Sequence, residues 1–91
     1  MAKPEWWNDE ELKALSVMVV RAAPTFAWAH SMRAWVLSGG AGAWEVGPRS
    51  AAELMEAAAH WDRAAALTDA PAVKAVCAEH ANECRGWAEA M

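Results

Sequence analysis

The sequence predicts an all-α fold, a compact bundle of three to four helices in a single domain. Three observations lead to this prediction. Apolar residues recur at helical spacing, segment boundaries carry capping residues or helix breakers, and alanine, the best helix former, supplies about a quarter of the chain. A chain of 91 residues supports one hydrophobic core. We therefore expect negligible strand content and one domain spanning residues 1–91.

The first helix is predicted from Asp9 to Ala22. Asn8 is a favourable N-cap, and Glu11 follows it at capping-box spacing. Apolar residues then continue at helical spacing through Leu12, Leu15 and Val19. Pro24 ends or kinks this helix because proline lacks the N–H that a helix interior needs.

A second helix is predicted over residues 25–37. One face carries Trp28, Met32 and Trp35. Phe26 and Leu37 point nearly opposite, so we expect this helix to be buried on two sides. Its end lies at the Ser-Gly-Gly segment of residues 38–40, and the glycines and proline of residues 41–48 predict a loop.

Two further helices are predicted in the second half of the chain. Ser50 and Glu53 form a capping-box pattern, and the third helix should end near Leu67. Either Thr68 or Asp69 is expected to cap the fourth helix, with Pro71 in its first turn, where a missing N–H costs little. A continuous apolar seam is predicted along this helix through Val73, Cys77, His80, Cys84, Trp87 and Met91.

The core is predicted to pack large side chains on small ones, because seven tryptophans accompany the many alanines. Four tryptophans lie on helical seams and are predicted to be buried: Trp28, Trp35, Trp61 and Trp87. A domain of this size has room in its interior for only some of its indoles. Trp6 and Trp44 are the ones expected at the surface.

Charge and hydropathy narrow the range of partners. The formal net charge is −4 and no cluster of Lys or Arg is present, so a nucleic-acid partner is not expected. Arg21, Pro24, His30 and Arg33 interrupt the apolar stretch from residue 12 to residue 36, which argues against a membrane span. We expect a cytoplasmic protein, and the absence of isoleucine and tyrosine fits a GC-rich bacterial or phage genome.

One group of potential metal ligands stands out, namely Cys77, His80 and Cys84 on one helical face. The two cysteines are separated by about 10.5 Å along a straight helix, whereas each thiolate of a zinc site lies about 2.3 Å from the ion. A site would need ligands from another helix, such as His30 or His60. The alternative is that all three occupy core positions, and we expect no metal, no cofactor and no disulfide between the cysteines.

Catalytic chemistry finds little support in the sequence. His60 lies one turn from Glu56 and close to Asp62, yet His60 and Asp62 face different directions on a helix. Glu53, Glu56 and Arg63 are expected to surround His60 as a solvated face would. No nucleophile, phosphate-binding or dinucleotide-binding motif is present. We therefore expect a protein that is not an enzyme.

The leading functional hypothesis is a protein-binding module, a small acidic inhibitor or adaptor of bacterial or phage origin. Trp44, Trp6 and Glu45 are the candidate docking residues, because exposed tryptophan is enriched at interface hot spots. A protein partner or a homodimer would occupy them. The same Trp44 could instead cover the core as a lid.

The alternative hypothesis is a binding protein for a small apolar ligand. Its candidate site lies between helices and consists of Trp28, Met32, Trp35 and Trp61. A third, weaker hypothesis is a metal or redox protein that uses Cys77, His80 and Cys84.

Overall fold

The computed structural model of the protein describes residues 9–38 and 50–91, which form four α-helices and contain no strand. The helices are α1 (Asp9–Ala22), α2 (Ala27–Ser38), α3 (Ala51–Leu67) and α4 (Pro71–Glu89). The predicted all-α bundle is confirmed. No helix in these two ranges is long and apolar enough to cross a membrane.

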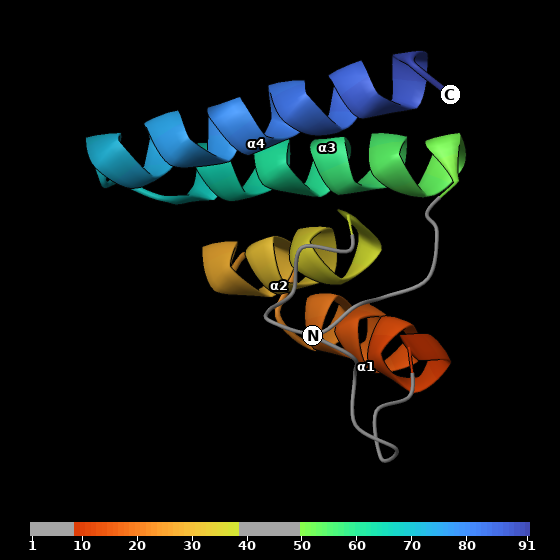
Figure 1. The fold of residues 1–91 in the computed structure, drawn as a ribbon. Coiled ribbons are helices and arrows are strands. Elements are labelled where there is room, and N and C mark those ends of the chain that lie inside the picture. Colours follow the sequence, from red (N-terminus) through yellow and green to blue (C-terminus); the bar gives the residue numbers. More distant parts are fainter. Residues whose placement is uncertain (1–8, 39–49) are drawn as a thin grey trace, which may run out of the picture.

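The helices stack in chain order, so that each packs mainly on the helix before it and the helix after it (Figure 1). The last two helices, α3 and α4, run antiparallel as a hairpin (Figure 1). The helix α2 lies between α1 and α3 and packs on both, but of the two sides predicted to be buried, the one that carries Trp28 and Trp35 is exposed and only Leu37 on the other is buried. It begins at Ala27, two residues later than Thr25, because a turn precedes it in which Phe26 N–H donates to Ala23 O (3.1 Å).

The core lies where α2, α3 and α4 meet, and it packs one large side chain among small ones. Trp61 on α3 is 4% exposed, and alanine and cysteine surround it. The core cluster consists of Ala34, Leu37, Ala57, Ala58, Trp61, Ala64, Cys77, Ala81 and Cys84. Small side chains let the helix backbones approach closely, and the indole fills the volume that they leave. The predicted large-on-small core is confirmed.

The capping box of α3 is confirmed. The Ser50 hydroxyl accepts a hydrogen bond from Glu53 N–H (3.0 Å), and Ser50 N–H donates to Glu53 Oε1 (3.1 Å). The Asn8 cap predicted for α1 lies outside the described residues.

The predicted cap of α4 is wrong. Its N-cap is Ala70, which makes no side-chain capping bond. Pro71 occupies the first helical turn, where its missing N–H would be unpaired in any case, and this places the cap at the residue directly before it. Thr68 is too early to cap, and its hydroxyl instead accepts a weak hydrogen bond from Ala70 N–H (3.4 Å).

Three of the four tryptophans predicted to be core are exposed. Trp61 is buried, whereas Trp28, Trp35 and Trp87 expose 59%, 42% and 52% of their surface. The predicted α4 seam is likewise buried only in part, at Cys77 and Cys84. Its end positions Val73, Trp87 and Met91 are exposed, and His80 is half-buried.

The length of the helices explains why the seam is incomplete. With 19 residues, α4 is about 10 Å longer than α2, which has 12 residues, at a rise of about 1.5 Å per residue. The shorter helix cannot cover the seam along its whole length. Apolar side chains therefore remain open on the side of the bundle where α2 faces α4.

Candidate functional site

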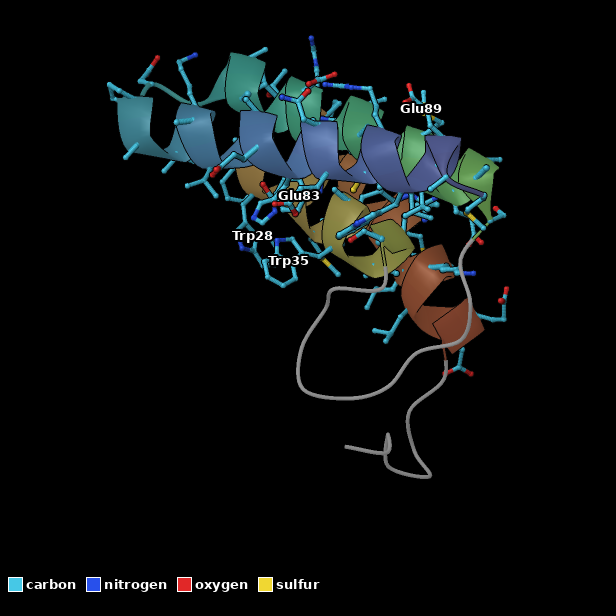
Figure 2. The ribbon with its side chains drawn as sticks, turned by 45° about the horizontal axis from the view of Figure 1, so that its top comes forward. Trp28, Trp35, Glu83 and Glu89 are labelled. Carbon is cyan, nitrogen blue, oxygen red and sulfur yellow. The ribbon has the colours of Figure 1, made fainter. Side chains whose placement is uncertain are left out.

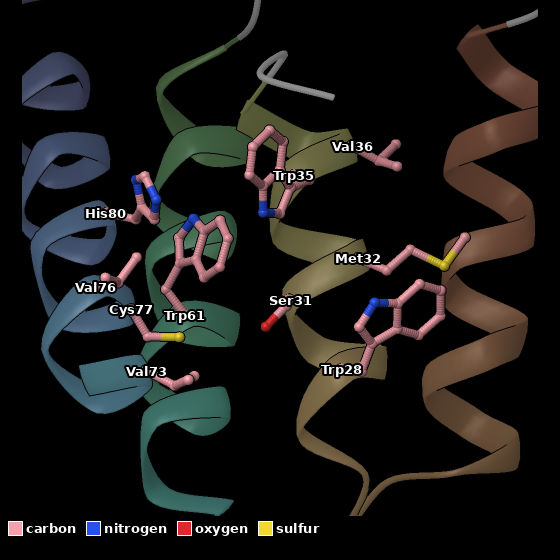
Figure 3. Close-up of a pocket in the computed structure, with 10 residues that line it drawn as sticks. All are labelled: Trp28, Ser31, Met32, Trp35, Val36, Trp61, Val73, Val76, Cys77 and His80. Atoms are coloured by element: carbon pink, nitrogen blue, oxygen red, sulfur yellow. The ribbon is translucent and has the colours of Figure 1, made fainter. Parts of the chain in front are cut away.

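An apolar groove of about 430 Å³ lies between α2 and α4, over α3. We call it the tryptophan groove. Its lining residues are Trp28, Ser31, Met32, Trp35, Val36, Trp61, Val73, Val76, Cys77 and His80 (Figure 3). The helices α2 and α4 pack against α3 more closely than against each other, and this arrangement leaves the space between them.

Each wall of the groove comes from one helical face. On α2, Trp28, Met32 and Trp35 follow at intervals of four and three residues, so their side chains lie on the same side of the helix. On α4, Val73 and Val76 line the groove beside Cys77. Figure 3 shows this α4 set opposite the side chains of α2, with Trp61 of α3 between them.

Contacts between aromatic rings pack the centre of the groove. The rings of Trp35 and Trp61 meet edge to face, with centroids 6.0 Å apart and an interplanar angle of 64°. His80 lies against the Trp61 ring at 4.7 Å and against Trp35 at 6.1 Å. These contacts restrain the rings, so that the groove is formed before any ligand arrives.

The described lining of the groove contains few polar side chains. None of the described residues that line it is Asp, Glu, Lys or Arg, and its polar groups are the indole N–H groups, the Ser31 hydroxyl, the Cys77 thiol and the His80 imidazole. Burial raises the pKa of the neighbouring Cys84 thiol, aided by the negative charge of Glu83, so that cysteine stays protonated at neutral pH. The surface therefore suits an apolar group rather than a charged substrate.

The four residues proposed from sequence as an apolar-ligand site are brought together here. Trp28, Met32, Trp35 and Trp61 all line the tryptophan groove. Six further lining residues were not predicted as part of this site: Ser31, Val36, Val73, Val76, Cys77 and His80. The signal for Val76 was present, because it follows Val73 by three residues on α4 and so shares its face.

The residues proposed for docking on a protein partner are not placed by the structure. Trp6, Trp44 and Glu45 lie outside the described residues. Exposed aromatic side chains are instead found at Phe26, Trp28, Trp35 and Trp87.

The proposed metal ligands do not converge in the described ranges. Cys77 and Cys84 are both buried and free, and His80 stacks on Trp61. Within residues 9–38 and 50–91, no group of three His, Cys, Asp or Glu side chains is placed to hold a metal ion.

The two histidines considered as additional ligands form a pair with each other instead. Buried His30 donates from Nε2 to the Pro24 carbonyl oxygen (2.8 Å), and its Nδ1 lies 3.0 Å from Nδ1 of His60. In the neutral state His30 Nδ1 is therefore the acceptor and His60 Nδ1 the donor. The rings are stacked, with centroids 5.3 Å apart. This pair ties α2 to α3.

His60 was expected to lie on a solvated face. The structure differs, because the contact with His30 partly buries the His60 side chain. Burial lowers the pKa of His60, and the hydrogen bond to Glu56 opposes this effect only in part. Asp62 is directed elsewhere and pairs with Arg85 (2.8 Å). The predicted separation of His60 from Asp62 is thus confirmed.

No protein-family model matches the chain, and no match is found among curated proteins or solved structures.

Proposed function

We propose that the protein is a non-enzymatic binding protein that holds a small apolar ligand in the tryptophan groove. One observation carries this proposal, namely a formed groove with three indoles and, among the described residues, no Asp, Glu, Lys or Arg in its lining. Its volume of about 430 Å³ falls within the range of roughly 300–1,000 Å³ that is typical of ligand pockets. Burial of an apolar ligand would remove both the ligand and the exposed indoles from water.

A substitution in the groove wall tests the proposal. Val76 is 48% exposed, so Val76→Glu places a carboxylate in the groove with little effect on the core. We expect this variant to lose binding of the uncharged fluorescent probe N-phenylnaphthylamine, because an apolar ligand would desolvate the charge. Binding equal to that of the unmodified protein would contradict the proposal.

Met55→Glu is the matched control. Met55 is also 48% exposed, but it lies on α3 away from the groove lining. This variant should bind the probe as the unmodified protein does. Equal loss of binding in both variants would indicate a general effect of charge and would contradict a site in the groove.

A second candidate function is docking on a protein partner, as an acidic inhibitor or adaptor of bacterial or phage origin. The observation in its favour is the exposure of Trp28 and Trp87, since large exposed aromatic side chains are typical of interfaces. Trp44→Ala and Trp28→Ala should each weaken a partner complex by about 2 kcal/mol or more. If the partner is a second copy of the chain, light scattering should show the molecular mass rising from that of a monomer to that of a dimer as the protein concentration increases. Unchanged partner affinity in both variants would contradict docking through tryptophan.

A further inference from the structure

A second, smaller hollow of about 160 Å³ adjoins the tryptophan groove. Three indoles from three helices line it, Trp35 on α2, Trp61 on α3 and Trp87 on α4. The remaining lining residues are Ser38, His80, Glu83 and Cys84. We propose that this hollow, here called the indole cage, binds a quaternary ammonium group, with Glu83 as the counter-charge.

The arrangement of the rings supports a cation as occupant. Trp35 and Trp61 meet edge to face at 64°, and Trp61 is only 4% exposed, so Trp35 and Trp87, at 42% and 52% exposure, offer most of the indole surface that is open to a cation. In the described part of the chain, Trp87 makes no ring contact with Trp35 or Trp61, and it lines the hollow as a third indole. The face of an indole carries the negative end of its quadrupole and attracts cations, and aromatic cages of this kind recognise quaternary ammonium groups.

Charge complementarity comes from Glu83. This carboxylate lies one helical turn before Trp87 on α4, so the two side chains share a face. Figure 2 shows Glu83 on the same side of the molecule as Trp35. Among the described residues that line the cage there is no Lys or Arg, and Glu83 Oε2 lies 3.8 Å from His80 Nδ1. The site therefore favours a positive charge and disfavours a negative one.

The small number of acceptors selects the kind of cation. A primary ammonium has three N–H donors and a guanidinium has five, and each donor that is buried without an acceptor costs free energy. Among the described lining residues Glu83 is the one carboxylate, and the other side-chain acceptors are the neutral Ser38 hydroxyl and His80 imidazole. A quaternary ammonium has no N–H to satisfy, and its methyl groups contact the indoles directly.

Three residues, Trp35, Trp61 and His80, line both the indole cage and the tryptophan groove. A chain attached to the ammonium group would therefore continue into the groove. The ligand class is then an amphiphile with a quaternary ammonium head and an apolar tail. Binding of the tail in the groove rests on the proposed function, whereas binding of the ammonium group in the cage does not depend on it.

Isothermal titration with small probes tests the cage. Choline should bind at least about tenfold more tightly than dimethylbutanol, its uncharged carbon isostere, because only choline gains the cation–π and carboxylate interactions. Hexyltrimethylammonium should bind about tenfold more tightly still than tetramethylammonium, because its tail enters the groove. Equal affinity for choline and its isostere would overturn the proposal.

Two charge-matched variants localise the interaction. Glu83→Gln should weaken tetramethylammonium binding severalfold, whereas Glu89→Gln should leave it unchanged, because Glu89 lies on the same helix but outside the cage lining (Figure 2). Trp87→Leu, at an exposed position, should also weaken binding. Equal effects of the two glutamate variants would overturn the cage, since they would indicate only a general attraction to the acidic protein.

The outcomes separate the cage from the proposed function. Binding of tetramethylammonium without any gain from the hexyl tail would support the cage and contradict the groove. Binding of N-phenylnaphthylamine without preference for the ammonium group would support the groove and overturn the cage. Binding of tetramethylammonium only after Trp44→Ala would also overturn the proposal, because the chain itself would then occupy the hollow.

Discussion

At the scale of single residues, Arg33 connects three helices. From α2 its guanidinium donates to the Lys13 carbonyl oxygen (2.9 Å) and to the Ser16 hydroxyl (3.0 Å), both on α1. It also donates to Glu56 Oε2 on α3 (2.9 Å). Ser16 is fully buried, and the Arg33 side chain is only 11% exposed. None of the apolar side chains of residues 10–22 is fully buried, so this polar cluster is a main connection between α1 and the other helices.

Replacement of Arg33 tests this role. We expect Arg33→Gln to lower the free energy of unfolding by about 2–4 kcal/mol, because the buried acceptors lose their donor. Arg85→Gln is the matched control, since Arg85 also bonds a carboxylate at 2.8 Å but is 36% exposed. It should cost less than about 1 kcal/mol. Equal losses in urea denaturation would contradict the role of Arg33.

His60 gives the stability a dependence on pH. Burial lowers the pKa of His60 below its ordinary value of 6.5, so the unfolded chain binds a proton that the folded chain resists. Stability should therefore be retained above about pH 6.5 and fall as the pH drops below it, by at most about 1.4 kcal/mol per pH unit. This window lies above the titration of Glu53, whose pKa is lowered chiefly by its hydrogen bond with Lys13.

Urea denaturation between about pH 7.5 and about pH 5.5 measures this dependence. The slope should be smaller in His60→Gln, which keeps a polar partner for His30 but does not titrate. An unchanged slope in the variant would assign the pH dependence to other groups.

At the scale of helices, α3 and α4 begin differently although both starts were predicted to be capped. Ser50→Ala should destabilise the protein by about 1 kcal/mol, because it removes the acceptor of Glu53 N–H. Thr68→Ala should change stability by less than about 0.5 kcal/mol, because Thr68 does not cap α4. Thermal melting of the two variants checks this difference, and a larger loss for Thr68→Ala would contradict the observed cap.

The helix boundaries could be predicted from sequence because local chemistry determines them. The start of α1 at Asp9 agrees with the prediction, and the capping box at Ser50 follows from short-range hydrogen bonds. The cap of α4 was misplaced because Thr68 and Asp69 are good capping residues by type, whereas Pro71 fixes the start by its geometry. At this boundary the residue types favour a cap at Thr68 or Asp69, whereas the position of Pro71 requires the cap at Ala70.

At the scale of the whole molecule, the burial of each tryptophan depends on which helix faces it. Trp28 and Trp61 both lie on apolar helical seams, yet Trp61 lies on the central α3 and is buried, while Trp28 lies at the open edge of α2. Periodicity identifies a seam but does not specify its partner. The large side chains of the tryptophan groove on α2 and α3 could be predicted from sequence, whereas its wall on α4 depends on the relative lengths of the helices.

The most direct test of the tryptophan groove follows its indole N–H signals by NMR while hexanol is added. Assignment by single Trp→Phe variants separates the seven tryptophans. Binding in the groove predicts that Trp28, Trp35 and Trp61 shift together along one saturable curve, and that the same shifts are lost in Val76→Glu. Signals that do not move, or that all move alike without saturating, would contradict a binding site between α2 and α4.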